Sequence, residues 1–300
     1  MKRSFGYLTV FLLMTALGMN SLQAKEFKLK LKKGDHFDYV FTSNDKVAQK
    51  MNNRFVAAVQ ESSLTFRLSV LGRLKNGNYR MEADYKRFAA DMSMDGNEMS
   101  YNSDSTYKAN SNWIADLLNG MTKIHLIYEI SPLGVVSNLT GLEDLTKKIS
   151  SDMRLSNLLK GIGTNEFVGQ LLSYFPKGDV EPGAKWVVHS QLPELKDLGY
   201  DLNYTFDKAT SDQVRFDFQA KFNYESPKSN NQVENDIQMK ETITQNGHLI
   251  LNPKTNMPET SNLEQVVDVM VTRTDQRTMM KTTVPMKITT ENSLKLIKSK

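Results

Sequence analysis

Four histidines have the widest chemical range of any side chains in this 300-residue sequence, and they are far apart along the chain. No two of them have the spacing of a metal-binding pair, and the HExxH pattern is absent. A histidine that is isolated within a strand usually has a structural or surface role. The sequence therefore predicts no metal site at these residues, which are His36, His125, His189 and His248.

Motifs that hold phosphate or activate a nucleophile are missing as well. The sequence contains no GxSxG, no GxxxxGK[ST] and no GxGxxG that follows a strand pattern. The nearest glycine pair, Gly161 and Gly163, separates two helical patterns. Adjacent acids such as Glu143 and Asp144 fit a helix start, and carboxylate catalysis needs a proximity that spacing alone does not show. We therefore expect no catalytic residues and no cofactor.

The first 24 residues have the pattern of a secretory signal peptide. Lys2 and Arg3 precede an apolar run, and the small residue Ala24 closes a short polar segment. Residues 25–300 are then expected to form a single β-rich domain that is periplasmic or secreted in a bacterial cell envelope. No later segment has the about 20 apolar residues of a spanning helix, so no membrane span is expected after removal of the signal.

Composition narrows the partners further. Residues 1–24 hold two of the 38 basic residues and none of the 34 acidic ones, so the remaining chain is nearly neutral. Binding to nucleic acid requires a concentrated basic face, so we expect no nucleic-acid partner. The sequence has no cysteine, so we expect no disulfide and no lipoprotein anchor.

Alternation of apolar and polar residues predicts strands at both ends of the chain. The clearest case is VRFDFQAKFNY, residues 214–224, in which every second side chain is apolar over all eleven positions. Turn signals at Gly34, Asn76-Gly77, Asp95-Gly96 and Asn246-Gly247 separate the strand patterns and predict consecutive hairpins.

Residues 111–176 have apolar residues at helical spacing instead, apart from a short β-hairpin predicted at residues 124–136 with its turn at Pro132-Leu133-Gly134. We therefore predict an α+β fold, in which a strongly curved antiparallel β-sheet, a half-barrel or clam-like structure, carries short amphipathic helices on one face. An outer-membrane barrel fits less well, because Pro285 interrupts a late strand and Glu241 would place a carboxylate in lipid.

A space between sheet and helices would suit a lipid or another amphipathic ligand. Apolar stripes of this kind are more often ordinary core, and both interpretations stay open. The residues predicted to line such a site are Trp113, Leu117, Leu118, Phe167, Leu171, Phe175, Phe216, Phe218 and Phe222.

Lysines recur at every second position near the predicted start of the mature chain, at Lys28, Lys30 and Lys32, followed by Lys33. One interpretation is contact with an anionic envelope lipid or glycan. The other, which we favour, is that the lysines protect the exposed edge of a strand from pairing with another chain.

Four segments resemble an uncharacterised family of secreted β-rich envelope proteins from Bacteroidota-type bacteria, a domain of unknown function. They are LKKGDHFDYVF (31–41), ISPLGVVSNLTG (130–141), YFPKGDVEPGAKW (174–186) and GHLILNPKTN (247–256). The resemblance spans most of the chain and supplies no functional residues. It departs from the family pattern at Asn256, where a turn glycine is usual.

Three hypotheses of function follow. The first is a non-enzymatic envelope protein that binds a hydrophobic or amphipathic ligand between the sheet and the helices. The second is a structural or interaction module with a fully packed core, whose partner is another envelope protein. The third is an unrecognised hydrolase that acts on envelope or glycan substrates.

Overall fold

The computed structural model describes residues 25–51, 54–94, 96–105, 125–141, 172, 174–192, 195–226, 236–274 and 280–299. Every regular element in these ranges is a β-strand. Their bounds are β1 Lys25–Glu26, β2 His36–Met51, β3 Arg54–Arg73, β4 Tyr79–Met94, β5 Asn97–Asn102, β6 His125–Ile130, β7 Val136–Thr140, β8 Asp179–Val180, β9 Lys185–Leu192, β10 Leu195–Ala209, β11 Val214–Glu225, β12 Asp236–Leu251, β13 Pro258–Thr274 and β14 Lys281–Ser299.

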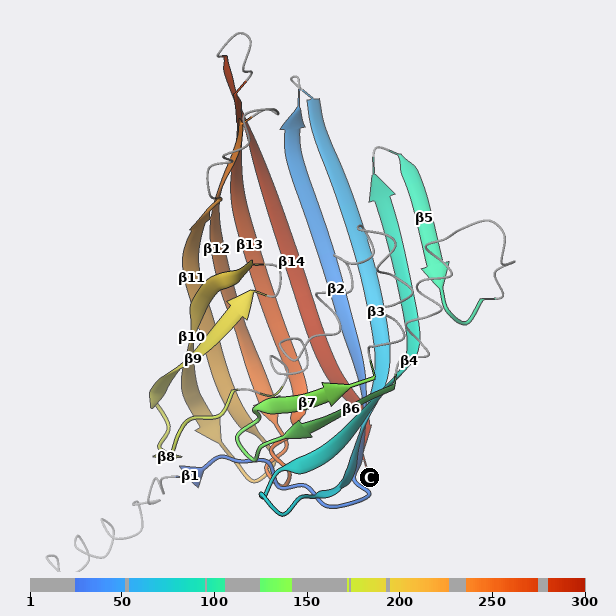
Figure 1. Ribbon diagram of the computed structural model, residues 1–300, viewed down its shortest axis with the longest axis vertical. Coiled ribbons are helices and arrows are strands. Elements are labelled where there is room, and N and C mark those ends of the chain that lie inside the picture. The colour runs from blue at the N-terminus through green and yellow to red at the C-terminus, as the bar shows by residue number, and fades with distance from the viewer. Residues whose placement is uncertain are drawn as a thin grey trace, which may run out of the picture.

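Twelve of these strands form one antiparallel sheet, in which two meanders meet side by side (Figure 1). The first meander runs β7-β6-β4-β3-β2, and β5 also pairs with β4. The second runs β14-β13-β12-β11-β10-β9. The seam between them is the β2–β14 pair, so the last described strand lies beside the second. A separate two-stranded sheet pairs β1 with β8.

Successive side chains on each long strand face opposite sides of the sheet, and we name these sides the core face and the polar face. On β11 the even-numbered residues lie on the core face, where Val214, Phe216 and Ala220 are buried. The odd-numbered residues of β11 lie on the polar face and are exposed or half-buried. The predicted alternation of residues 214–224 is therefore confirmed.

The main hydrophobic core joins both meanders through residues on the core face. Tyr39 of β2, Phe66 of β3, Tyr128 of β6 and Phe216 of β11 all belong to it. A smaller core cluster of Ile243, Val267 and Val269 lies further along the second meander. Within the described residues, the apolar faces of the strands thus pack on one another and on segments that cross them.

The extended segment 27–32 is the most important of these crossing segments. Phe27, Leu29 and Leu31 alternate toward the core and are buried, whereas the lysines between them are exposed. The backbone amide of Leu29 donates to the carbonyl of Pro132 at 2.8 Å, and that of Lys30 donates to the carbonyl of Thr255 at 3.0 Å. These bonds tie the segment to the β6–β7 turn and to the β12–β13 turn at once.

The predicted α+β fold class is wrong. The described residues contain no helix, and the sheet is neither closed nor strongly curled, so it is not the predicted half-barrel covered by helices. The helical insertion predicted near 111–176 falls mostly outside the described residues. Within it, the short hairpin predicted around Pro132 is confirmed, since β6 and β7 pair antiparallel, and residues 174–176 are not helical. No described helix has the length and apolar character needed to cross a membrane.

Turn chemistry was a better guide to structure than helical spacing. Gly34, Gly77 and Gly96 have φ values of 92°, 87° and 79°, which supports the three turns predicted there. The turn predicted at Asn246-Gly247 is wrong, because β12 continues through it and Gly247 lies opposite Phe218. Asn256 replaces the usual turn glycine and still adopts the same left-handed conformation, with a φ of 57°.

Candidate functional site

A pocket of about 700 Å³ lies against segment 27–32, and we name it the cationic pocket. Five cationic side chains and one carboxylate line it. The carboxylate, Glu26, forms an ion pair with Lys28 at 2.7 Å. Apolar contributions come from Leu29, Leu31, Tyr79, Pro132 and Leu133, and the charged residues are Glu26, Lys28, Lys30, Lys32, Arg73 and Lys177.

The lysines of the pocket are held together by the burial of their neighbours. Because Phe27, Leu29 and Leu31 point into the core, Lys28, Lys30 and Lys32 must share the opposite side of the segment. The backbone is fixed by further bonds, since the Asn256 side-chain amide donates to the Lys28 carbonyl at 2.8 Å. The Tyr79 hydroxyl donates to the Leu29 carbonyl at 3.0 Å. The like charges are therefore placed by the fold itself.

Arg73 and Lys177 reach the same pocket from distant parts of the chain. The Arg73 guanidinium lies 5.6 Å from the centre of the Tyr79 ring, and its Nε donates to the Gly77 carbonyl at 3.3 Å. These contacts orient a planar cation whose N–H groups can donate to two oxygens of an anion. Lys177 follows the buried Tyr174 and Phe175, which anchor the backbone just before it.

The crowding of cations also affects Lys25 at the start of the segment. Burial, followed by the positive charge of Lys30, lowers the pKa of the Lys25 amine. Its Nζ lies 5.3 Å from the centre of the Phe27 ring. The electrostatic potential around segment 27–32 is therefore positive, and an anion placed there would relieve the repulsion between its lysines.

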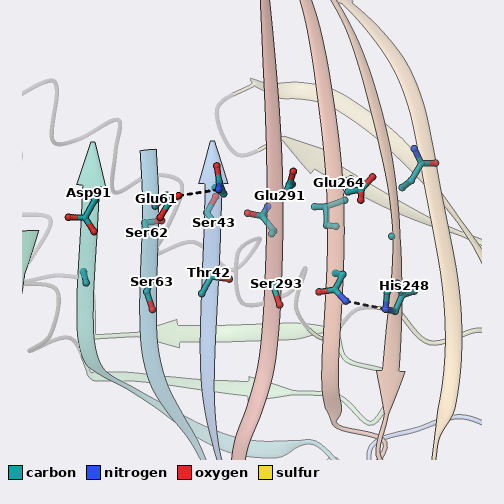
Figure 2. Close-up of a pocket in the computed structure, with 17 residues that line it drawn as sticks. Thr42, Ser43, Glu61, Ser62, Ser63, Asp91, His248, Glu264, Glu291 and Ser293 are labelled. Atoms are coloured by element: carbon teal, nitrogen blue, oxygen red, sulfur yellow. Dashed lines mark hydrogen bonds between the residues drawn. The ribbon is translucent and has the colours of Figure 1, made fainter. Parts of the chain in front are cut away.

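A second pocket of about 800 Å³ lies on the polar face, across six strands (Figure 2). We name it the acidic depression, because its lining contains four carboxylates and no lysine or arginine. One row of paired residues crosses it in the order Asp91, Glu61, Asn44, Glu291 and Glu264. A second row, which includes Ser63, Thr42, Ser293 and His248, lies beside it (Figure 2).

Hydrogen bonds within the acidic depression are few. The Asn44 amide donates to Glu61 at 3.4 Å, and the Ser100 hydroxyl donates to Asp91 at 2.5 Å. His248 Nε2 lies 3.1 Å from the Asn262 amide nitrogen. Glu264 and Glu291 are direct cross-strand partners, and so are Glu61 and Asp91. Like charges in such positions repel each other, so this row does not contribute to sheet stability.

The four histidines remain apart in the folded chain. His125 contacts Glu82 at 3.0 Å and Asp84 at 2.7 Å, and His189 contacts Asp201 at 3.0 Å. Burial acts to raise the pKa of Asp84, but the hydrogen bond from His125 and the charge of Lys86 outweigh it and hold that pKa below its usual range. Within the described ranges no group of such side chains is arranged to hold a metal ion.

The residues predicted to line a ligand site fall into two groups. Phe175 and Phe216 are buried in the main core, Phe218 packs against it, and Phe222 packs against the smaller cluster. Neither of the two pockets above is lined by these four phenylalanines. The other predicted residues lie outside the described part of the chain: Trp113, Leu117, Leu118, Phe167 and Leu171.

Sequence reasoning found part of the cationic pocket and missed the rest. The alternating lysines were visible as a stripe, although Lys33 of that stripe does not line the pocket. Arg73 and Lys177 gave no signal, because only the tertiary fold brings them to residues more than forty positions earlier in the chain. The rows of the acidic depression were equally hidden, since their order depends on the β2–β14 seam.

Comparison with known proteins identifies the family of the chain but assigns no function to it. No curated protein matches its sequence. A family profile described as a family of unknown function, DUF6263, matches residues 76–258, which is more than half of the chain. This range contains Tyr79, the β6–β7 turn and Lys177 of the cationic pocket. The expectation of an uncharacterised family is thereby confirmed, and the chain belongs to the DUF6263 family.

Proposed function

We propose that this protein is a non-enzymatic binding protein of the bacterial cell envelope, and that it holds an anionic amphipathic ligand in the cationic pocket. One observation carries the proposal. Lys28, Lys30 and Lys32 project together from a segment whose intervening side chains are buried, and Arg73 and Lys177 converge on the same space.

The charge of the pocket supports an anionic group as ligand. Among the described residues, Lys28 is the one cation of the five that has a carboxylate partner within the pocket. Concentrating like charges on one side of a segment costs free energy. Protection of a strand edge does not explain that cost, because segment 27–32 crosses the core and is not an edge strand of the large sheet. A bound phosphate or carboxylate would offset that cost through charge-assisted hydrogen bonds.

The floor of the pocket supports an apolar part in the same ligand. Leu133 is 39% exposed in the β6–β7 turn, and Pro132 lies beside it in the same lining, whereas the side chains of Leu31 and Tyr79 are buried beneath the pocket. Ligand pockets typically combine such apolar surface with a few charged groups that set orientation. The proposed site is therefore at segment 27–32, because the described residues contain no helices that could form the expected space over the sheet.

The envelope location rests on the sequence of residues 1–24, whose charged start, apolar run and small closing residue are typical of a secretory signal. These residues lie outside the described structure. A periplasmic or secreted protein would meet anionic lipids and anionic glycans, and both present the chemistry that the pocket favours.

A packed interaction module is the second candidate, and one observation favours it. Phe216 makes ring contacts with Phe27, Tyr174, Trp186 and Phe206, so the aromatic side chains on this part of the core face contact one another. Under this alternative the cationic pocket would contact an acidic surface of another envelope protein.

Binding of two lysolipids tests the first proposal. Lysophosphatidylglycerol, which is anionic, and lysophosphatidylcholine, which is zwitterionic, are titrated below their micelle concentrations and followed by calorimetry. We expect tighter binding of the anionic lipid, and an affinity that falls as salt is raised. The triple variant Lys28→Gln, Lys30→Gln, Lys32→Gln should lose this preference.

A charge-matched control is available on other strands. Lys208, Lys221 and Lys287 are exposed and line neither pocket, so their replacement by Gln removes the same net charge. This control variant should bind lysophosphatidylglycerol like the wild type. Equal binding of both lipids by the wild type, or equal loss in both triple variants, would refute the proposal.

A further inference from the structure

Three methionines form an exposed cluster on the β4–β5 hairpin. Met92 is 37% exposed, Met94 is 51% exposed and Met99 is 38% exposed. Met92 and Met99 are direct cross-strand partners, and Met94 lies two residues further along β4 on the same face. The three thioethers therefore lie at one end of the hairpin, on the side of the sheet that carries the core.

The spacing of the cluster lets its sulfurs approach one point. Direct cross-strand partners have Cβ atoms about 5 Å apart, and diagonal neighbours such as Met94 and Met99 about 7–8 Å apart. Methionine is unbranched and flexible, so each Sδ can move several ångströms from its Cβ toward the centre of this triangle. The hairpin can thus supply three sulfur ligands without a change in its backbone.

Two carboxylates of the hairpin lie on the side opposite the methionines. Asp91 pairs with Ser100, and Glu98 pairs with Ser93, so both carboxylates lie on the opposite side of the hairpin. On the side of the methionines, the paired residues of β3 are Gln60 and Ala58. Within the described part of the hairpin and its β3 partners, the cluster is therefore rich in thioether sulfur and poor in carboxylate oxygen and imidazole nitrogen.

Packing does not account for these side chains. Tyr101, two residues beyond Met99 on the same face, is 5% exposed and marks the limit of the main core. The methionines lie past this limit and remain accessible. Exposed strand positions usually carry polar or β-branched residues, so three accessible thioethers on one face require another reason.

We propose that Met92, Met94 and Met99 form a binding site for a soft monovalent metal ion, with Cu(I) as the preferred metal. Thioether sulfur is a soft donor that selects Cu(I) over hard cations such as Ca²⁺ and Mg²⁺. It carries no proton, so binding requires no deprotonation. The chain has no cysteine, so no thiolate of its own competes for the metal.

The test is an anaerobic Cu(I) titration of the whole protein against the chelator bicinchoninate. The wild type should take one equivalent of Cu(I) from the chelator. The variant Met92→Leu, Met94→Leu, Met99→Leu keeps the apolar volume and should bind at least about 10-fold more weakly. Thermal unfolding of both proteins verifies that the variant is folded.

Two exposed methionines elsewhere supply the control. Met270 is 45% exposed on β13 and Met280 is 68% exposed before β14. The variant Met270→Leu, Met280→Leu should retain the affinity of the wild type. X-ray absorption at the copper edge should show sulfur in the first coordination shell. A shell of nitrogen and oxygen alone, or equal affinity in the wild type and the triple variant, would overturn the proposal.

Discussion

The ring of Phe27 meets the ring of Phe216 edge to face, with centroids 5.0 Å apart and an interplanar angle of 90°. The two residues are 189 positions apart in the sequence, and both side chains are fully buried. Phe216 belongs to the most regular alternating strand of the chain. The contact therefore ties segment 27–32, which carries the lysines of the cationic pocket, to the centre of the second meander.

Removal of either ring should destabilise the protein strongly. Phe27→Ala or Phe216→Ala leaves a cavity and should each lower the free energy of unfolding by about 3–5 kcal/mol. The double variant should lose less than the sum, because the rings also stabilise each other by about 1 kcal/mol. Urea unfolding of the four proteins measures this coupling.

Phe222 provides the control for that cycle. It lies on the same strand, six residues or about 20 Å from Phe216, and packs on the smaller cluster. Phe27→Ala and Phe222→Ala should therefore be additive. Coupling as large for this pair as for Phe27 and Phe216 would argue against a direct ring contact.

Gly247 should not tolerate a side chain, although it is not a turn residue. A Cβ added there would meet the backbone oxygen of Asn262 and the ring of Phe218. We expect Gly247→Ala to lower the free energy of unfolding by about 1–3 kcal/mol. Gly72 lies in β3 with no atom within 4 Å of an added Cβ, so Gly72→Ala should be neutral or slightly stabilising. Thermal unfolding compares the two variants, and equal effects would contradict the steric argument.

Gly247 also shows why local patterns misplaced part of the fold. Asn-Gly is a strong hairpin signal, and the sequence offers no sign that β12 continues through it. The glycine is explained by the neighbouring strand, because the ring of Phe218 occupies the space of its missing side chain. A turn rule based on neighbouring residues in the sequence thus fails where a contact between strands determines which residue type is required.

The same limit applies to the burial of residues 214–224. Their alternation predicted correctly which side chains face the core. It did not predict that Phe27, Trp186 and Phe206 would cover Phe216, because a period of two reports that a face is buried and not what buries it. The alternation of the lysines could be predicted from the sequence for a similar reason. The position of Arg73 beside them could not, because it depends on the tertiary fold.

Repulsion in the acidic depression should be measurable. Glu264 and Glu291 are direct cross-strand partners, so Glu291→Gln should raise the free energy of unfolding by about 0.2–1 kcal/mol. The gain should shrink at high salt, which screens the repulsion between exposed charges. Glu225 pairs with Lys240 at 3.2 Å, and Glu225→Gln should give no such gain. A loss of stability in Glu291→Gln would show that this carboxylate makes a favourable contact instead.

The hydroxyl of Tyr128 is buried without a hydrogen-bond partner among the described residues, and burial raises the pKa of this phenol. Burying an unpaired hydroxyl is unfavourable, so Tyr128→Phe should be neutral or stabilising. The Tyr39 hydroxyl, by contrast, donates to the Pro258 carbonyl at 2.8 Å. Tyr39→Phe should therefore cost about 1 kcal/mol in urea unfolding. A large loss in Tyr128→Phe would reveal an ordered water or another partner for its hydroxyl.

The ion pair of Asp38 and Arg67 should make the stability of the fold depend on pH in the acidic range. Arg67 Nε and Nη2 donate to the two Asp38 oxygens at 2.6 and 2.8 Å, and the Asp38 side chain is only 15% exposed. The hydrogen bond from Arg67 is the main reason that the pKa of Asp38 is lowered, and it outweighs the opposing effect of burial. A folded-state pKa below the unfolded value means that the pair stabilises the protein above the unfolded pKa of about 3.9.

That contribution must be lost as the pH falls through the folded-state pKa of Asp38. At pH 7, Asp38→Asn should therefore lower the free energy of unfolding by about 1 kcal/mol, since Arg67 is partly exposed to solvent. The difference between wild type and variant should shrink as the pH is lowered toward 3. Asp201, which contacts His189 and is 63% exposed, is the matched control, and Asp201→Asn should have little effect at either pH. A wild-type advantage that stays constant from pH 7 to pH 3 would mean that Asp38 acts through its shape and not through its charge.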